Sequence, residues 1–186
     1  MTPSLLQSSG SATLPLHLGF YLRQDQLTAV KLTEAPHLTY HIEGASPRSY
    51  ALVEQWLEHY LFGAHETFPL PLDAAALSLF SRRVLLEMSV LPFGTTVSYQ
   101  TIAQRSGHPR AARAVGTVCN RNPFPLVIPC HRIIQSNGSL GGFALGHKIK
   151  EKMLAFEREI VNTHSFTSFY TDETLGNDGK GKIPDS

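Results

Sequence analysis

Residues 98–119 read SYQTIAQRSGHPRAARAVGTVC, and this stretch decides the fold of the second half of the chain. It predicts two short helices, residues 98–105 and 109–119, joined by a turn around Gly107, which is the pattern of a helix-turn-helix. Many helix pairs share this spacing and bind no DNA. The small residues of the second helix are Ala111, Ala112, Ala114 and Gly116. They allow either tight packing against another helix or close approach to a ligand, and both interpretations stay open at this point.

Charge is distributed unevenly around this stretch. Between Met88 and Lys150 the chain has no Asp or Glu. The basic residues there are Arg105, Arg110, Arg113, Arg121, Arg132, Lys148 and Lys150. The segment therefore carries +7 and the rest of the chain −6, although the whole chain carries only +1. Such segregation is typical of a surface that meets a polyanion, but an anion or cofactor site, or chance, would explain it too. Together with the small residues of the helix, it favours DNA.

The first half of the chain predicts mixed α/β structure. Two apolar segments, residues 17–23 and 27–32, surround Gln24-Asp25-Gln26 and predict a hairpin, and residues 38–42 predict a third strand. Ser46-Pro47 is typical of a helix N-terminus. Apolar side chains then recur at helical spacing before Gly63, at Leu52, Trp56, Leu57, Tyr60 and Leu61.

Further elements are expected in the second half. We expect a helix over residues 74–90, a short buried strand at Leu126-Val127-Ile128, and a last helix over residues 147–158. The fold class is therefore an α/β N-terminal domain followed by a mainly α C-terminal domain with a helix-turn-helix. The expected boundaries are residues 1–72 for the first domain and its linker, 73–162 for the second, and 163–186 for a flexible tail.

Composition limits the class of protein. With 186 residues the chain suits one large or two small domains. Its two cysteines argue against a disulfide scaffold and exclude a Cys-rich zinc site. A His/Asp/Glu metal site stays open, but no HExxH-like spacing is present, and we expect no metal in the site. Neither a signal peptide nor a membrane-spanning apolar run is evident, which predicts no membrane contact and a cytoplasmic location, or a nuclear one in a eukaryote.

The dipeptide Cys130-His131 suggests a cysteine that acts as a nucleophile. A thiolate is a strong nucleophile, and a neighbouring imidazole and a positive field favour its formation. Adjacent side chains on a strand point to opposite faces, so the pair can cooperate only if Pro129 breaks the strand. The alternative is a buried structural cysteine beside an unrelated histidine. Glu157 lies on the apolar side of the last helix and is a candidate to orient the imidazole, unless the end of that helix faces water.

The run from Asn122 to Ile134, NPFPLVIPCHRII, resembles the active-site signature of O6-alkylguanine-DNA alkyltransferases, also called methylated-DNA–protein-cysteine methyltransferases. Residues 97–100, 112–116, 136–138 and 150–157 fall at the spacing of that family. The resemblance extends over residues 77–157, and it implies a poorly conserved α/β domain before them. It implies repair of double-stranded DNA that contains O6-alkylguanine, chiefly O6-methylguanine, by a monomer that needs no cofactor. The alkyl group would pass irreversibly to the cysteine, once per protein molecule.

The resemblance also implies a role for each site residue. Cys130 is the acceptor, His131 takes the thiol proton through a water, and Glu157 orients the imidazole. The second helix of the helix-turn-helix enters the minor groove, where Arg113 fills the gap left by the flipped nucleotide. Tyr99 pushes on the target phosphate and assists the departure of guanine. The remaining expected contacts to DNA are Gln100, Ala112 and Ser136, and those of the substrate pocket and hinge are Asn122, Ile133, Phe143, Ala144 and Leu145.

The sequence departs from the family pattern at two positions, and three other functions are alternatives to the one that the resemblance implies. Leu145 stands where relatives have the first glycine of a pair, and this difference bears on the size of the alkyl pocket. Phe143 stands where some relatives have tyrosine.

The alternative functions are a lesion-binding protein without transfer activity, a helix-turn-helix regulator in which Cys130 senses alkylation, and a thiol hydrolase. Cys130 itself argues against the first, because such binding proteins lack the acceptor.

Overall fold

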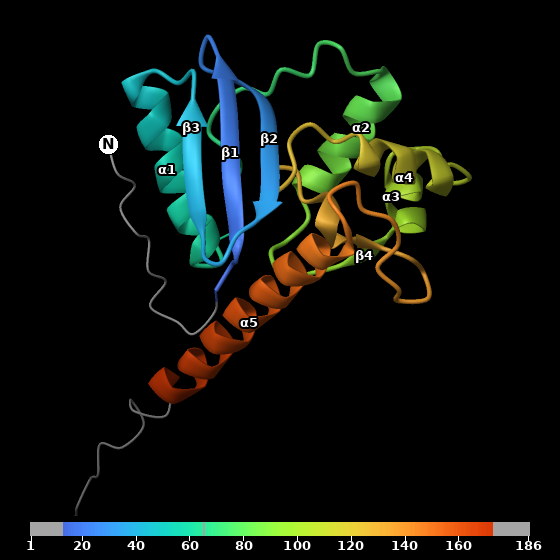
Figure 1. The fold of residues 1–186 in the computed structure, drawn as a ribbon. Helices are drawn as coiled ribbons and strands as arrows, with labels where there is room; N and C mark the ends of the chain where they lie inside the picture. The colour runs from blue at the N-terminus through green and yellow to red at the C-terminus, as the bar shows by residue number, and fades with distance from the viewer. Residues whose placement is uncertain (1–12, 65, 173–186) are drawn as a thin grey trace, which may run out of the picture.

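The computed structural model describes residues 13–64 and 66–172, with the backbone alone for residues 164–172. A three-stranded sheet and one helix form the first half, and four helices with a two-stranded sheet form the second (Figure 1). The mixed sheet and helices agree with the expected fold class.

The first half is built on the predicted hairpin. Strands β1 (Leu16–Arg23) and β2 (Gln26–Glu34) pair antiparallel, and β3 (Thr39–Glu43) pairs parallel with β1, giving the order β2-β1-β3. Gln24 and Asp25 both have positive φ, 50° and 58°. Two successive left-handed residues make the type of tight turn that matches the twist of an antiparallel pair. The three expected strands are confirmed.

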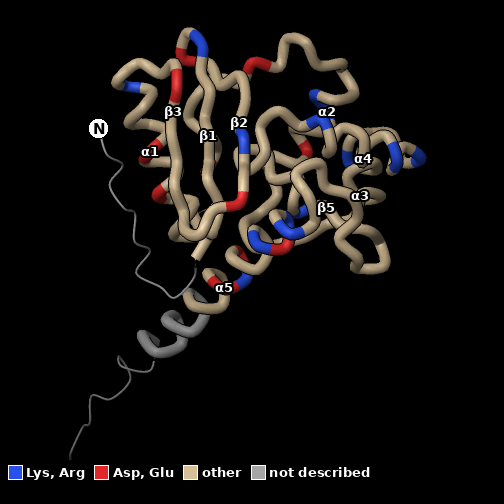
Figure 2. Tube along the Cα trace, in the orientation of Figure 1, with Lys and Arg blue, Asp and Glu red and all other residues tan. Residues whose placement is uncertain are grey.

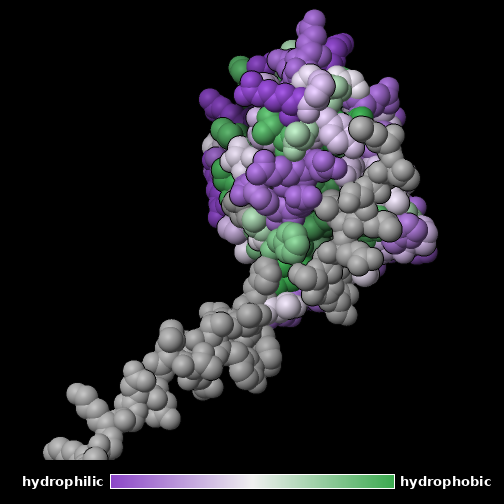
Figure 3. All heavy atoms as spheres, turned by 90° about the vertical axis from the view of Figure 1, so that its left-hand side faces the viewer, coloured by the Kyte–Doolittle hydropathy of each residue, from purple (hydrophilic) through white to green (hydrophobic). Residues whose placement is uncertain are grey.

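Helix α1 (Pro47–Leu61) covers one face of this sheet (Figure 1). Its N-cap is Ser46, whose side chain accepts a hydrogen bond from Ser49 N, and Pro47 occupies the first turn as expected. The buried side packs Trp56 edge-on against Phe20 of β1, with ring centroids 6.4 Å apart. Seen from the α1 side, hydrophilic side chains cover much of the surface, as expected where an amphipathic helix faces water (Figure 3).

Helix α2 (Leu79–Ser89) starts later than expected, because Ser78 rather than a residue near Ala74 caps it. The Ser78 hydroxyl accepts from Ser81 N at 3.1 Å. Before the cap, the chain turns and is held by Arg82, whose guanidinium donates to Ala75 O at 2.8 Å and to Leu77 O at 3.0 Å. The expected helix over residues 74–90 was therefore too long at its N-terminal end.

Two short helices follow, α3 (Tyr99–Arg105) and α4 (Ala112–Asn120). Ser98 caps α3, which starts at Tyr99, one residue after the expected start, and Gly107 has φ +80° in the connecting turn. The second helix was expected from Pro109, but a turn in which Ala111 N donates to His108 O at 2.9 Å precedes it. The α3–α4 region carries basic and no acidic residues, whereas acidic residues occur on the sheet, α1, α2 and α5 (Figure 2).

The expected strand at Leu126–Ile128 is wrong. These residues form a turn in which Leu126 has φ +75° and Ile128 N donates to Phe124 O at 2.8 Å. Prolines at positions 123, 125 and 129 remove the backbone donors that a strand would need. Cys130 is consequently the first residue of a 3-10 helix, η1 (Cys130–Arg132), and not the end of a strand.

A two-stranded parallel sheet joins two parts of the second half. Its strands are β4 (Val97–Ser98) and β5 (Ile133–Ile134). Strand β4 leads directly into α3, and β5 follows directly after η1. The pairing of the two strands therefore brings Tyr99 close to the Cys130-His131-Arg132 turn. Backbone and ion-pair contacts also connect the two halves of the chain, including Val30 N to Pro123 O at 2.8 Å and Lys152 Nζ to Glu34 Oε2 at 2.7 Å.

Helix α5 (His147–Asp172) is much longer than the expected helix over residues 147–158. The first Gly or Pro after Arg158 is Gly176, so nothing in the sequence breaks the helix where the tail was expected to begin. The helix extends into the expected tail as far as Asp172, and residues 173–186 lie outside the described part of the chain, so a flexible tail over residues 163–186 stays a prediction. The hydrophobic core is one cluster with members from both halves, and the expected domain boundary near residue 72 remains a prediction.

Candidate active site

The Asn122 side chain holds the turn that presents Cys130. Its Nδ2 donates to Ile128 O at 2.9 Å and to Cys130 Sγ at 3.2 Å, while its Oδ1 accepts from Phe124 N at 3.0 Å. One amide thereby satisfies two backbone groups of a turn that has no sheet partner. The same amide fixes the position of the sulfur.

Cys130 is buried, with 2% of its surface exposed. Burial raises the pKa of its thiol, while the hydrogen bond from Asn122 and the charge of Lys150 act in the opposite direction. The resting state is therefore a thiol, and a base must accept its proton before the sulfur can act as a strong nucleophile.

The neighbouring residue His131 is fully buried and faces Glu157. Its Nε2 lies 2.8 Å from Glu157 Oε1. Burial lowers the pKa of His131 although Glu157 opposes this, so the imidazole is neutral. A neutral imidazole beside a carboxylate carries its proton on Nε2, an assignment made from the hydrogen bonds, which leaves Nδ1 as the basic nitrogen. Nδ1 is buried and has no hydrogen-bond partner among the described residues.

Glu157 is fully buried and is surrounded by donors. Arg132 makes a two-pronged contact, with Nη2 2.8 Å from Oε1 and Nε 2.9 Å from Oε2. Gly94 N donates to Oε2 at 3.0 Å, and Tyr60 OH donates to Oε1 at 3.0 Å. Burial opposes ionisation, yet His131 and Arg132 together lower the pKa of Glu157 below its usual value. The carboxylate is therefore an anion that orients the imidazole.

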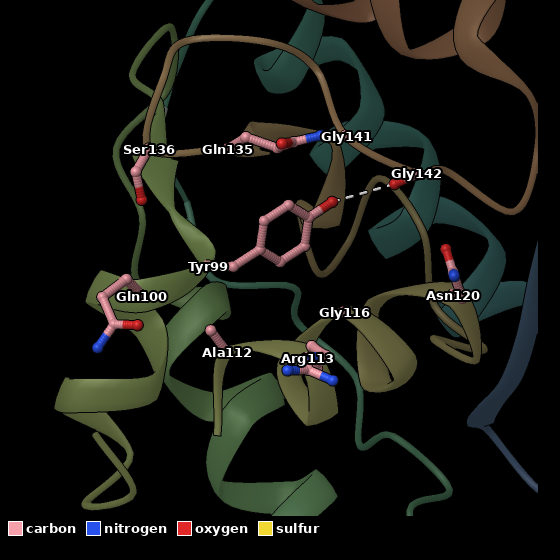
Figure 4. A pocket seen from close by; sticks show the side chains of 10 residues that line it. All are labelled: Tyr99, Gln100, Ala112, Arg113, Gly116, Asn120, Gln135, Ser136, Gly141 and Gly142. Carbon is pink, nitrogen blue, oxygen red and sulfur yellow. Dashed lines mark hydrogen bonds between the residues drawn. The ribbon is translucent and has the colours of Figure 1, made fainter. Parts of the chain in front are cut away.

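A groove lies between α3, α4 and the Gly141–Gly142 segment. Its volume is about 340 Å³, and it is lined by Tyr99, Gln100, Ala112, Arg113, Gly116, Asn120, Gln135, Ser136, Gly141 and Gly142. Tyr99 lies across its centre, below the Gly141–Gly142 segment and above α4, which carries Arg113 (Figure 4). Tyr99 OH donates to Gly142 O at 3.0 Å, and burial raises the pKa of Tyr99 to about 12. The tyrosine is thus a neutral hydrogen-bond donor.

Lys150 connects α5 to the segment that follows η1. Its ammonium group is buried and donates to the carbonyl oxygens of Ile133 and Leu140. The same nitrogen lies 5.8 Å from the ring centroids of Tyr99 and of Phe143. It therefore ties β5, the following loop and α5 together and places a cation near the thiol.

Comparison with known proteins gives the family. The model of the DNA-binding domain of 6-O-methylguanine DNA methyltransferase matches residues 79–159. The methylated-DNA–protein-cysteine methyltransferase of Methanothermobacter thermautotrophicus is 35% identical over 143 residues, which cover 76% of this chain and 80% of that protein. This chain belongs to the methylated-DNA–protein-cysteine methyltransferase family. The protein of that name from Cricetulus griseus is 43% identical over 118 residues, and there the match spans only 56% of its length.

A solved structure agrees with the family assignment. The crystal structure of Mycobacterium tuberculosis OGT in complex with DNA is similar with a TM-score of 0.61 and 28% identity. The match covers 76% of this chain and 86% of that one. An O6-methylguanine-DNA methyltransferase from Pyrococcus kodakaraensis, at 17% identity and a TM-score of 0.56, shows the same fold.

The structure separates the predicted site residues of this family member into two groups. Cys130, His131, Glu157 and Asn122 form one buried cluster, and the groove brings together Tyr99, Gln100, Ala112, Arg113 and Ser136. Gln100 also donates to Pro109 O at 2.6 Å, which ties α3 to the turn before α4. Among the described residues, no direct hydrogen bond joins Cys130 to His131, because His131 Nδ1 has no protein partner.

The expected pocket residues after Cys130 are not among the residues that line the groove. Ile133 and Phe143 are buried in the core, and Ala144 is exposed. Leu145 is partly buried and packs against the core cluster. Its role as a wall of the alkyl pocket remains a prediction, and the structure supplies a core contact that also accounts for a leucine there.

Sequence reasoning missed three residues of the buried cluster: Tyr60, Arg132 and Lys150. Arg132 lies next to His131 in the sequence. A buried carboxylate such as Glu157 needs a cation beside it, and this requirement could have pointed to Arg132. No signal of this kind pointed to Tyr60, which is 97 positions away from Glu157.

Neither a metal site nor a membrane span is found in the described parts of the chain. No group of three or more His, Cys, Asp or Glu residues there could hold a metal ion. No described helix is both long and apolar enough to cross a membrane.

Proposed function

We propose that this protein repairs alkylated DNA by transferring the alkyl group of O6-alkylguanine, chiefly O6-methylguanine, to Cys130. The observation that carries the proposal is the buried cluster in which Asn122 holds the sulfur and a neutral His131 is oriented by Glu157. Family membership supports it, and so does the similarity to a Mycobacterium tuberculosis protein crystallised with DNA. No resident cofactor is needed for the transfer.

The proton of the thiol goes to His131 Nδ1. This nitrogen is buried, basic and without a protein partner among the described residues. Because buried polar atoms are normally satisfied, a water that bridges Nδ1 to Cys130 is the natural carrier of the proton. The imidazolium that forms is stabilised by Glu157, which stays ionised throughout.

The transfer itself is a displacement at the alkyl carbon. The Cys130 sulfur forms a bond to that carbon, the carbon–O6 bond breaks, and its electron pair stays on the guanine. Tyr99 is a neutral donor within the groove, and its hydroxyl, which donates to Gly142 O in the free protein, would turn to the departing base and assist its departure. A thioether is not cleaved by water, so each protein molecule reacts once.

DNA would bind over the groove through the helix-turn-helix formed by α3 and α4. Small residues let α4 enter the minor groove, and the acid-free segment provides a positive surface. The O6-alkyl group lies within the base stack, so the nucleotide must flip out, at a cost of a few kcal/mol. Arg113, exposed at the rim of the groove, would fill the gap. One chain supplies every group named here, so a monomer suffices.

Incubation with duplex DNA that carries a labelled O6-methylguanine tests the proposal. With excess DNA we expect at most one labelled methyl group per protein, located on Cys130 by mass spectrometry. Cys130→Ala should abolish labelling and leave DNA binding largely intact. Repeated turnover without an added reductant would contradict the single-use mechanism, and binding without labelling of the native protein would identify a lesion-binding protein instead.

A further inference from the structure

Helix α1 reaches the candidate active site through one side chain, Tyr60. Its hydroxyl donates to Glu157 Oε1 at 3.0 Å, across 97 positions of sequence. Tyr60 is 4% exposed and lies before residue 79, where the match to the family's DNA-binding domain begins. The first half of the chain therefore does more than cover the second half, because it contributes a donor to the buried carboxylate.

Packing alone explains the ring of Tyr60 but not its hydroxyl. The ring stacks on Trp56 at 5.8 Å between centroids and contacts Phe93 at 5.4 Å and Phe156 at 6.1 Å. A phenylalanine would make the same three contacts. What the hydroxyl adds is a hydrogen bond to a carboxylate that Arg132 and Gly94 already hold in place.

The hydroxyl binds the oxygen that also serves His131. Glu157 Oε1 accepts from His131 Nε2 at 2.8 Å, from Arg132 Nη2 at 2.8 Å and from Tyr60 OH at 3.0 Å. Donors that share one oxygen compete for its negative charge, so each additional donor weakens the pull of the carboxylate on the others.

We infer that Tyr60 is a positioning residue of this site, which limits the attraction of Glu157 for the His131 proton and so keeps the imidazole available as a base. The inference rests on the proposed function, in which His131 accepts the thiol proton. Tyr60 suits the task because it is neutral: burial and the Glu157 charge raise the pKa of its hydroxyl well above the usual value. It withdraws charge from Oε1 without adding a second cation beside Arg132.

The direction of the effect follows from the charges around His131. Burial favours the neutral imidazole, Glu157 on α5 favours the protonated one, and Arg132 on η1 and Lys150 on α5 disfavour it. The Cys130 thiol and the Tyr60 hydroxyl are the other titratable groups of the cluster, and both are neutral at rest. Removing the Tyr60 hydroxyl returns charge to Glu157 Oε1, so the pKa of His131 should rise.

The Tyr60→Phe variant tests this inference. Its rate of methyl transfer from duplex DNA with O6-methylguanine should be measured in single turnovers from pH 4.5 to 8.5. We expect the acid limb of the pH–rate profile to move to higher pH by about half a unit to one unit. At pH values below this limb, the rate of transfer should therefore fall about three- to tenfold. The matched control is Tyr40→Phe, which removes another buried phenol–carboxylate hydrogen bond, from Tyr40 OH to Glu54 on α1. That control should leave the limb in place.

A second readout does not depend on the reaction. The ring signals of His131 can be followed against pH by NMR in protein with labelled histidine, for the native chain and for both variants. Tyr60→Phe should shift this titration to higher pH by the same amount as the rate limb. An unchanged midpoint would overturn the inference, whether the rates stay equal or fall uniformly at every pH. If the native protein transfers no methyl group, the proposed function fails while the NMR titration still decides the role of Tyr60.

Discussion

Replacing Glu157 with Gln would remove the buried negative charge and leave the shape of the site almost unchanged. All the groups that touch this carboxylate are donors: His131, Arg132, Tyr60 and Gly94 N. An amide presents an NH2 group in place of one oxygen, and whichever way it turns, that group meets a donor. The position therefore favours a carboxylate on geometric grounds as well as on charge.

The stability loss follows from Arg132. Its guanidinium is buried, with 3% of its surface exposed, and Glu157 is its anionic partner. Leaving a buried charge without its partner typically costs about 3–5 kcal/mol. For a chain of this size each kcal/mol lowers Tm by about 2–4 °C, so Glu157→Gln should lower Tm by about 6–20 °C.

The loss of activity has a different cause. Without the carboxylate, the proton of His131 is no longer held on Nε2, and the imidazole can adopt the tautomer that has no lone pair on Nδ1. General bases contribute about a hundredfold to ten-thousandfold to rates, so we expect at least about a hundredfold slower methyl transfer at neutral pH. Single-turnover kinetics and thermal unfolding of the same preparations measure the two effects separately.

A double variant separates stability from chemistry. Arg132→Met combined with Glu157→Gln removes both charges of the pair, and replacing a buried ion pair by apolar groups is often neutral for stability. The double variant should regain most of the lost Tm and remain slow. Normal transfer by either variant at neutral pH would refute the assignment of Glu157 as the group that orients His131.

Two further predictions concern the groove. Arg113→Ala should slow repair of duplex DNA at least about tenfold and leave reaction with the free base O6-methylguanine within about twofold, because only the duplex requires flipping; equal losses on both substrates would make Arg113 a structural residue. Gly141→Ala should slow transfer and lower Tm, since a Cβ there would lie 2.8 Å from Tyr99 Cε2 at a φ of +66°, and overpacking costs about 1–3 kcal/mol. Gly138→Ala is its control, with φ +83° and nothing within 4 Å, and a loss as large as that at Gly141 would show that backbone strain alone is responsible.

The elements with local signals were predicted from the sequence. Ser46-Pro47 starts α1 through a contact from Ser46 to Ser49, three positions away, and the hairpin turn needs only two residues in the left-handed region. The errors arose where a local pattern was ambiguous. Three apolar residues at 126–128 match a buried strand, but the surrounding prolines and the Asn122 amide favour a turn. Likewise, the absence of a helix-breaking residue, and not the polarity of the tail, sets the length of α5.

The sequence by itself determined the candidates Cys130 and His131, because a cysteine followed by a histidine after a proline can be recognised without the fold. Only the tertiary structure decided how these side chains are arranged and which groups surround them. Glu157 lies on α5, Gly94 on the loop before β4 and Tyr60 on α1, and their meeting depends on how these segments pack around one core. Sequence patterns report on neighbours within a few residues, whereas the protonation of His131 depends on a desolvated carboxylate and on donors that packing alone brings to it.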